Sequence, residues 1–236
     1  MTEICKNIEA IREKIRIVQT DAGRETPVRL MAVTKFVDAD RINEAIDLGG
    51  IREIGENRPQ ELCEKYDKLH LDGVKVHMIG SLQTNKVKYI IDKVDMIHSL
   101  DSERLAAEID RQAEKHGKVM DCLIEVNIGK EENKGGVLPE DVLPFYEAVK
   151  AYPHLRICGL MTIAPFTEDE EQQRFWFSKT KEIFDRLSKL LPAGTTPVLS
   201  MGMSDSYPAA IACGSDIVRV GSAIFGSRPP KNMNNL

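Results

Sequence analysis

The sequence has few of the features that mark metal-binding or secreted proteins. Its 236 residues include five cysteines, which are scattered along the chain and form no C-x-x-C pair. An odd number of isolated cysteines argues against both a disulfide framework and a structural zinc site. The five histidines form no H-E-x-x-H motif or similar cluster, so the sequence does not predict a metal site.

Long apolar runs are missing as well. No segment approaches 18 consecutive apolar residues, the length that a transmembrane helix needs, so we expect no membrane span. Residues 1–6 are polar and lack the apolar core of a signal peptide, which makes a cytoplasmic protein the default expectation. The net charge is −5 and no basic stripe is interleaved with aromatic residues, which argues against binding of nucleic acid.

The chain does contain eight short apolar runs that alternate with helical patterns. Because parallel strands joined by helices show this alternation, the pattern predicts repeated β/α units. An open, doubly wound sheet would also fit, but eight units within about 200 residues favour a closed (β/α)8 TIM barrel. The expected strands are 30–35, 51–56, 75–80, 95–100, 121–127, 156–163, 197–201 and 216–221.

Helical patterns separate these runs and also open the chain. Isoleucines between residues 4 and 15 recur at helical spacing, which predicts an additional helix before the first strand. Asp38, Ser102 and either Ser204 or Asp205 are suited to N-cap positions, because their side-chain oxygens can accept from free helix N–H groups. The other expected helices are 38–48, 57–68, 84–92, 102–116, 139–151, 168–190 and 205–213.

Nothing in the composition divides the chain into parts. It has no linker rich in proline, glycine or serine, no short repeat and no low-complexity tract. We therefore expect a single domain over residues 1–228, followed by a short tail at 229–236. Barrel proteins of this class carry their sites at the carboxyl ends of the strands. Nearly every predicted strand ends in polar or small residues, which favours a binding site there.

Lys35 ends the first predicted strand. Burial disfavours the charged ammonium and can lower the pKa of a lysine, which leaves an amine that attacks an aldehyde to form a Schiff base. The alternative is a side chain that extends from the strand end into solvent, as lysine often does. The neighbouring strand ends favour the first interpretation.

Two segments rich in glycine and serine follow the seventh and eighth strands and suit a bound phosphate. They are Ser200–Asp205 and Val220–Gly226. Glycine lets the backbone approach a ligand, while hydroxyl groups and helix N-termini donate to an anion. The alternative is that Ser204 only caps a helix and Gly221 only forms a turn. Since the first and eighth strands are neighbours in a closed barrel, Lys35 favours a phosphate.

Arg219 interrupts the apolar strand at 216–221. A buried arginine needs a partner, because an unpaired buried guanidinium is very costly. The partner is either a carboxylate in the barrel mouth or the ring nitrogen of a bound heterocycle. Side chains alternate along a strand, so Ile217, Arg219 and Gly221 share one face.

An amine for an aldehyde, a phosphate site and an arginine in one barrel mouth together describe a site for pyridoxal 5′-phosphate (PLP). Many PLP enzymes place a carboxylate at the pyridine nitrogen, which keeps it protonated and makes the ring a strong electron sink. An arginine does not accept that proton, so the ring stabilises a carbanion less well. This arrangement suits a racemase of limited scope or a protein that only holds the cofactor.

Six segments extend this pattern over most of the chain. They are 32–35 (AVTK), 54–58 (IGENR), 77–86 (HMIGSLQTNK), 159–162 (GLMT), 199–205 (LSMGMSD) and 218–226 (VRVGSAIFG). Each is modest alone, but together and in this order they are specific. On these segments the chain resembles the YggS/PROSC family of PLP-binding, or PLP homeostasis, proteins.

The resemblance implies a TIM barrel similar to the alanine racemase N-terminal domain, with PLP held as a Schiff base on Lys35. It implies that Arg219 lies near the pyridine nitrogen and Asn57 near the ring. Phosphate contacts would come from Ser200 or Ser204 and from the segment that follows Arg219. The expected cofactor-binding residues are Lys35, Asn57, His77, Met161, Ser200, Met201, Ser204, Arg219, Gly221 and Ser222.

Two positions depart from the family pattern. The family's Ser-Lys-x-Gly segment reads Asn-Lys-Gly-Gly at 133–136, so the serine is missing. This change leaves a role of Lys134 as a secondary PLP acceptor open. The family's threonine after Arg-x-Gly is Ser222 here, which keeps a hydroxyl group.

The resemblance leaves two functions of different class. The first is a non-catalytic PLP carrier involved in intracellular PLP (vitamin B6) homeostasis and supply, with PLP-requiring apo-enzymes as recipients. The second is a PLP-dependent amino-acid racemase. Alanine racemases use a second base, a tyrosine from a carboxyl-terminal β domain, and the chain ends about ten residues after Gly226. We therefore expect a carrier and a monomer. An aldolase without cofactor would leave the phosphate segments and Arg219 unexplained.

Overall fold

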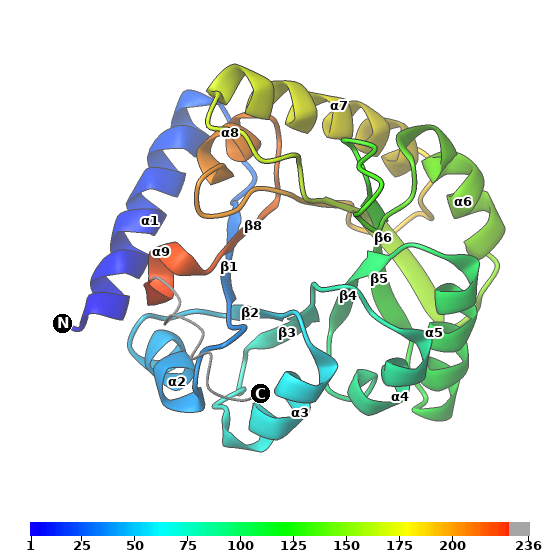
Figure 1. Ribbon diagram of the computed structural model, residues 1–236, viewed down its shortest axis with the longest axis horizontal. Coiled ribbons are helices and arrows are strands. Elements are labelled where there is room, and N and C mark those ends of the chain that lie inside the picture. Colours follow the sequence, from blue (N-terminus) through cyan, green and yellow to red (C-terminus); the bar gives the residue numbers. More distant parts are fainter. Residues whose placement is uncertain (227–236) are drawn as a thin grey trace.

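The computed structural model describes residues 1–226 and forms a closed barrel of eight parallel strands inside a ring of helices (Figure 1). The strands follow one another around the barrel in chain order, and β8 pairs with β1 to close it. The predicted TIM barrel is therefore confirmed, whereas the predicted tail lies outside the described residues. The strands are β1 (Arg29–Val33), β2 (Glu53–Glu56), β3 (Lys75–Met78), β4 (Met96–Leu100), β5 (Met120–Val126), β6 (Leu155–Thr162), β7 (Val198–Ser200) and β8 (Ile217–Val220).

The helices match the predicted ranges closely, with one addition after β8. The additional helix before β1 is confirmed as α1, and three short 3-10 turns accompany the longer helices: η1 (Tyr66–Lys68), η2 (Thr84–Lys86) and η3 (Pro139–Asp141). The α-helices are α1 (Glu3–Asp21), α2 (Ala39–Asp47), α3 (Pro59–Lys65), α4 (Val87–Ile90), α5 (Glu103–Lys115), α6 (Val142–Val149), α7 (Glu170–Ser188), α8 (Tyr207–Ala212) and α9 (Ser222–Phe225).

The predicted N-caps were partly correct. The Asp38 side chain accepts a hydrogen bond from the Arg41 amide and caps α2 as expected. Ser102 precedes α5, but its side chain makes no capping bond. The N-cap of α8 is Ser206 rather than Ser204 or Asp205. The helix begins later because residues 203–206 form a turn, in which the Ser206 amide donates to the Met203 carbonyl.

Apolar side chains fill both sides of the barrel wall. One large cluster lies between the strands and the surrounding helices, which is why the strands read as nearly continuous apolar runs. A smaller cluster fills the barrel interior and includes Met31 and Val33 on β1 and Ile217 on β8. None of the helices within residues 1–226 is long and apolar enough to cross a membrane.

The strand register places the segments after β1 and β8 side by side. Met31 pairs with Arg219, and Ala32 pairs with Val220. The segment after β1, which carries Lys35, therefore begins beside the segment after β8, which begins with Gly221. A Cβ atom at Gly221 would lie 3.3 Å from the Val33 Cβ, so glycine allows the two segments to approach closely. The sequence-based expectation that Lys35 lies beside the glycine-serine segment after the eighth strand is thereby confirmed.

Candidate functional site

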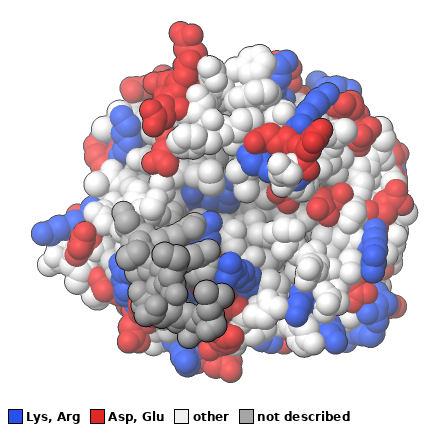
Figure 2. Space-filling view, viewed as in Figure 1, with Lys and Arg blue, Asp and Glu red and all other residues white. Residues whose placement is uncertain are grey.

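A pocket of about 240 Å3 opens at the carboxyl ends of the strands, between the segments that follow β1, β2, β7 and β8. Among the residues that the structure describes, its lining carries three basic side chains, Lys35, Arg41 and Arg219, and one acidic residue, Asp205. Lysine and arginine side chains also gather near the middle of the molecule in Figure 2. Such a site favours an anionic ligand. Six predicted site residues line it: Lys35, Asn57, Ser204, Arg219, Gly221 and Ser222.

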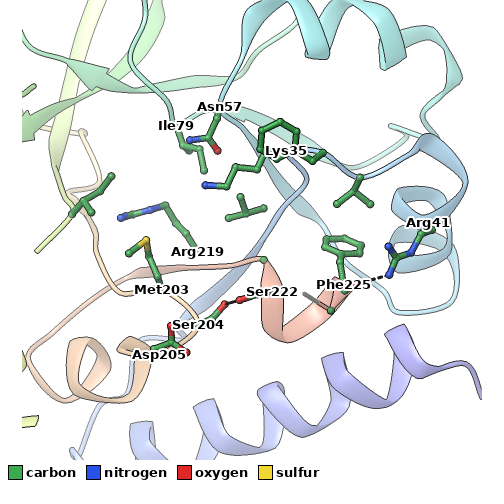
Figure 3. Close-up of a pocket in the computed structure, with 16 residues that line it drawn as sticks. Lys35, Arg41, Asn57, Ile79, Met203, Ser204, Asp205, Arg219, Ser222 and Phe225 are labelled. Atoms are coloured by element: carbon green, nitrogen blue, oxygen red, sulfur yellow. Dashed lines mark hydrogen bonds between the residues drawn. The ribbon is translucent and has the colours of Figure 1, made fainter. Parts of the chain in front are cut away.

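Lys35 lies in a turn that directly follows β1 and is partly buried. Its side chain extends into the pocket, toward Asn57 and Arg219 (Figure 3). The next residue, Phe36, has a φ of 62°, a left-handed conformation that is unfavourable for a bulky side chain. The turn therefore directs the lysine into the barrel mouth, and the alternative of a side chain that extends outward into solvent is not what the structure shows.

Arg219 is 3% exposed, and neutral oxygen atoms accept its hydrogen bonds. Nη1 donates to Oγ of Ser200 at 2.8 Å, and Nη2 donates to the carbonyl oxygen of Thr162 at 2.8 Å. No ion pair within residues 1–226 includes Arg219, so a carboxylate is not its direct partner. Burial lowers the pKa of Arg219 to about 10, which leaves it cationic at neutral pH. A guanidinium has five N–H groups, so donors remain for a ligand.

Ser204 and Ser222 join the segments after β7 and β8. The Ser222 hydroxyl donates to the Ser204 hydroxyl at 3.0 Å (Figure 3). The Ala223 amide donates to the same oxygen at 3.4 Å. Gly202 has a φ of 91°, and a Cβ atom there would lie 2.6 Å from the Ala210 Cβ. Glycine is therefore required for the chain to turn tightly from β7 toward the pocket.

Asn57 follows β2 and presents an amide group to the pocket. Its Oδ1 atom is buried and has no hydrogen-bond partner among the described residues. Such an atom is uncommon, because buried polar groups are nearly always paired. Gly80 packs against this residue, and a Cβ atom there would lie 2.3 Å from the Asn57 carbonyl oxygen. Asn57 is thus held in place by backbone contact and has an acceptor to offer a ligand.

The structure does not bring the other four predicted residues to the pocket surface. His77, Met161, Ser200 and Met201 are each at most 1% exposed. His77, Met161 and Ser200 lie one layer deeper in the barrel, on the last two residues of their strands, whereas Met201 packs in the cluster between the strands and the helices. Three pocket residues that the sequence analysis missed, Ile79, Ile163 and Met203, follow two positions after His77, Met161 and Met201 respectively.

His77 and Ser200 belong to a chain of buried polar side chains inside the barrel, below the pocket. His77 Nδ1 lies 2.9 Å from His98 Nε2, and His98 Nδ1 lies 3.2 Å from the Ser200 hydroxyl that accepts from Arg219. At the far end, His77 Nε2 is 3.6 Å from Oε2 of Glu53. Burial lowers the pKa of His77 to about 3 and that of His98 well below its usual range, so both rings are neutral. Arg219 only donates, so the Ser200 hydroxyl accepts from it, and the hydroxyl proton is available to His98 Nδ1.

Two further lining residues were also missed. Arg41 comes from α2, and its Nη2 atom donates to the carbonyl oxygen of Phe225 (Figure 3). Asp205 was expected as a helix cap, and it lines the pocket instead. Lys134, in the segment that departs from the family pattern, lines a neighbouring cavity and pairs with Glu131. Within residues 1–226, no group of histidine, cysteine or acidic side chains is arranged to hold a metal ion.

Comparisons with known proteins agree with this geometry. The model of the family described as alanine racemase, N-terminal domain, matches residues 7–229. A pyridoxal phosphate homeostasis protein of Aquifex aeolicus is 42% identical over 225 residues, covering 95% of this chain and 98% of that protein. The pyridoxal phosphate homeostasis protein of Escherichia coli K12 is 37% identical over 233 residues, covering 97% of this chain and 98% of its own length.

Solved structures of known proteins have the same barrel fold as this chain. PipY of Synechococcus elongatus, with PLP bound, superimposes with a TM-score of 0.79 at 30% identity and covers 94% of this chain and all of its own. The alanine racemase of Corynebacterium glutamicum shares the fold, with a TM-score of 0.63 at 18% identity over 96% of this chain and 63% of that one. The chain therefore belongs to the alanine racemase N-terminal domain family and, within it, to the pyridoxal phosphate homeostasis proteins.

Proposed function

We propose that this protein binds pyridoxal 5′-phosphate as a Schiff base on Lys35 and acts in the homeostasis and supply of that cofactor. The names of its relatives and the PLP-bound PipY structure support this function. Under this proposal the recipients of the cofactor are PLP-requiring apo-enzymes. The protein itself is a cytoplasmic monomer that holds the cofactor without catalysing a reaction on it.

The observation that carries the proposal is the set of groups that share one pocket. Lys35 supplies an amine, Ser204 and Ser222 supply hydroxyl groups, and Arg219 supplies N–H donors. These match the aldehyde, the phosphate and the ring nitrogen of PLP in chemical type. The unpaired buried Oδ1 atom of Asn57 adds an acceptor without a partner, which fits a polar ligand better than an apolar core.

The cofactor, when bound, supplies an aldehyde for covalent attachment and a ring that can withdraw electrons. Lys35 would hold the aldehyde carbon, and Ser204, Gly221 and Ser222 would hold the phosphate. Arg219 would donate to the ring nitrogen. Since its guanidinium stays charged at neutral pH, it offers that nitrogen no proton acceptor and gives no support to a protonated ring. The ring is then a weak electron sink, which favours holding over catalysis.

The second candidate function, amino-acid racemisation, lacks one of its groups. Inverting a Cα centre calls for acid–base groups on both faces of the cofactor, and Lys35 can serve one face. No tyrosine or histidine from the described part of the chain lines the pocket. Tyr207, the nearest tyrosine in sequence to Ser204, is 8% exposed and packs in the core. We therefore favour a carrier over an enzyme.

Two measurements test this function. Purified protein loaded with PLP and dialysed should keep a near-visible absorbance band, and Lys35→Ala should lose it. Lys134→Ala is the matched control, because this lysine lies in the adjacent cavity, and it should keep the band. Incubation with single enantiomers of several amino acids should give no turnover at ordinary enzyme rates. Turnover that Lys35→Ala abolishes would instead assign a racemase.

A further inference from the structure

A buried charged cluster lies directly behind the turn that carries Lys35. It consists of Glu56 at the end of β2 and of Glu61 and Lys65 on α3, and we call it the Lys65 cluster. The ammonium group of Lys65 pairs with both carboxylates. The Glu56 side chain is 0% exposed and that of Lys65 is 9% exposed. None of the three residues lines the pocket, so the proposed cofactor site does not account for them.

Every residue that flanks Lys35 in the turn is bonded to this cluster. Lys65 Nζ donates to the carbonyl oxygen of Thr34 at 2.8 Å and to that of Val37 at 3.3 Å. The Thr34 hydroxyl donates to Oε1 of Glu56 at 2.5 Å. The Phe36 amide donates to Oε1 of Glu61 at 2.5 Å. The backbone is therefore held immediately before and immediately after Lys35.

The turn needs such restraint because of its conformation. Phe36 adopts a φ of 62°, which a side chain with a Cβ atom rarely adopts without compensation elsewhere. Its ring is 49% exposed, so core packing does not fix the residue. The hydrogen bond from its amide to Glu61 helps to hold this conformation, together with the turn bond from the Val37 amide to the Thr34 carbonyl oxygen. Without the bond to Glu61, we expect the turn to relax and the lysine to change direction.

Stability alone is a poor explanation for the cluster. Removing charges from water is costly, and well-packed apolar residues often replace a buried ion pair without loss of stability. An apolar replacement would, however, remove the Lys65 donor from the carbonyl groups of Thr34 and Val37, and Thr34 would keep only the Val37 amide as a backbone donor. What only the charged arrangement provides is a set of directed hydrogen bonds to the turn.

We propose that Lys65 is a positioning residue for aldehyde capture by Lys35, acting with Glu56 and Glu61 through the backbone of the turn. This proposal rests on the proposed function. In the capture step, the neutral Lys35 amine adds to the aldehyde carbon and a C=N bond replaces the C=O bond. The carbonyl oxygen and the two amine hydrogens leave as water. The Lys65 cluster takes no part in this chemistry and sets only the direction from which the amine approaches.

The test uses Lys65→Met in the full-length protein, together with the double variant Glu56→Gln/Lys65→Met, which also removes the fully buried carboxylate of Glu56. We expect capture of PLP, followed by its absorbance, to slow by about tenfold, since small misplacements of a reacting group cost up to about a hundredfold. Capture of pyridoxal, which lacks the phosphate, should slow by the same factor. Competition by inorganic phosphate should not change, because its site lies on the segments after β7 and β8.

Arg24→Met is the matched control. Arg24 pairs with Asp216 at 2.9 Å, and the two side chains are 16% and 20% exposed, but this pair lies before β8 and away from the mouth. The Arg24→Met variant should lower the midpoint temperature of thermal unfolding without slowing the capture of PLP. A second readout needs no cofactor: exchange of the Phe36 amide hydrogen should be faster in the Lys65 variants and unchanged in Arg24→Met.

If Lys65→Met does not fold, Glu61→Ala serves instead, since this side chain is 20% exposed and its loss removes the acceptor for Phe36. Faster Phe36 exchange with slower capture supports the proposal. Unchanged capture in a folded variant of the Lys65 cluster overturns it. Failure of the unmodified protein to capture PLP would overturn the proposed function instead, so the two outcomes are distinguishable.

Discussion

The hydroxyl group of Ser200 accepts a hydrogen bond from Nη1 of Arg219 at 2.8 Å inside the barrel. Ser200 was expected to touch a phosphate, but it is fully buried and orients the guanidinium from below the pocket. The same hydroxyl lies 3.2 Å from Nδ1 of His98, so one serine connects the pocket arginine to the buried histidines. This arrangement leads to predictions on stability, on pH dependence and on the cofactor site.

Ser200→Ala should destabilise the protein by about 1–3 kcal/mol, because it leaves a buried guanidinium N–H without its acceptor. The affinity for PLP should fall as well, since only the hydrogen bond to the Thr162 carbonyl oxygen then orients Arg219. Chemical denaturation and an absorbance titration measure the two effects. Ser99→Ala is the control: the Ser99 hydroxyl is buried and has no partner among the described residues, so its removal should cost little. Equal losses in both variants would contradict the prediction.

The free energy of unfolding should decrease as the pH is lowered into the acid range, because of His77 and His98. Burial holds the pKa of both rings below the value of 6.5 that applies when they are exposed. The unfolded chain therefore binds protons below about pH 6.5 that the native protein does not. Each histidine should lower the free energy of unfolding by up to about 1.4 kcal/mol per pH unit as the pH falls from about 6.5.

Urea unfolding of His98→Gln and of the unmodified protein, at several values from pH 7 to pH 5, checks this dependence. The difference between the two isolates the contribution of one histidine from that of the carboxylates. The variant should show the shallower loss of stability toward acid. Parallel curves for the two proteins would show that His98 is protonated in the native state.

Glu125 should have the opposite effect on the pH dependence of the free energy of unfolding. Burial, and secondarily the charge of Asp101, raise the pKa of this carboxyl group from 4.5 to about 7. The native protein then retains a proton that the unfolded chain has lost, so stability decreases as the pH rises from about 4.5 through 7. Glu125→Gln removes this loss and should stabilise the protein by about 1–3 kcal/mol at pH 8, while it has little effect at pH 4. Measurements of the free energy of unfolding at pH 4 and pH 8 test this prediction. Stabilisation by Glu125→Gln at pH 4 alone would contradict it.

Gly202→Ala should be costly, because it combines two faults. A left-handed backbone costs a residue with a Cβ atom about 1–2 kcal/mol, and the close contact with Ala210 adds about 1–3 kcal/mol. Gly73→Ala separates these effects, since Gly73 has a φ of 68° but no atom within 4 Å of the added Cβ. Thermal unfolding should show the larger loss of stability in Gly202→Ala. Inorganic phosphate should compete less well with PLP in that variant only. A larger loss at Gly73 would contradict this explanation.

The fold could be predicted because its signals are local and repeat. Strands buried on both faces read as apolar runs, and eight of them separated by helical patterns leave few alternatives. Only α9 escaped prediction, because its four residues are too short for periodicity to show. The start of α8 was misplaced since three residues in a row, Ser204, Asp205 and Ser206, are all good caps.

The candidate site could be predicted in part. Lys35, Arg219, Ser204 and Ser222 were found because strand ends and unusual residue types reveal them. His77, Met161 and Ser200 were placed in the pocket although they lie below it, and Met201 packs against the helices instead. Along β3 and β6 the alternation gives the correct face but not the layer, so Ile79 and Ile163 were missed. Met203 follows the turn at Gly202, where the alternation of β7 no longer applies. Knowing where each strand ends would have supplied that information.

The Lys65 cluster could not have been predicted at all. Lys65 looks like an ordinary basic residue at the end of a helix, where lysine is common. Its contacts with Thr34 and Val37 join residues that are 31 and 28 positions apart. Only the packing of α3 against the barrel mouth brings them together.

Borohydride trapping followed by peptide mass mapping tests the central claim most directly. Reduction of the PLP-loaded protein fixes the cofactor to the amine that holds it, and the modified peptide identifies that residue. We expect one pyridoxyl group, on Lys35. An adduct on Lys134 or on any other lysine, with Lys35 unmodified, would contradict the account.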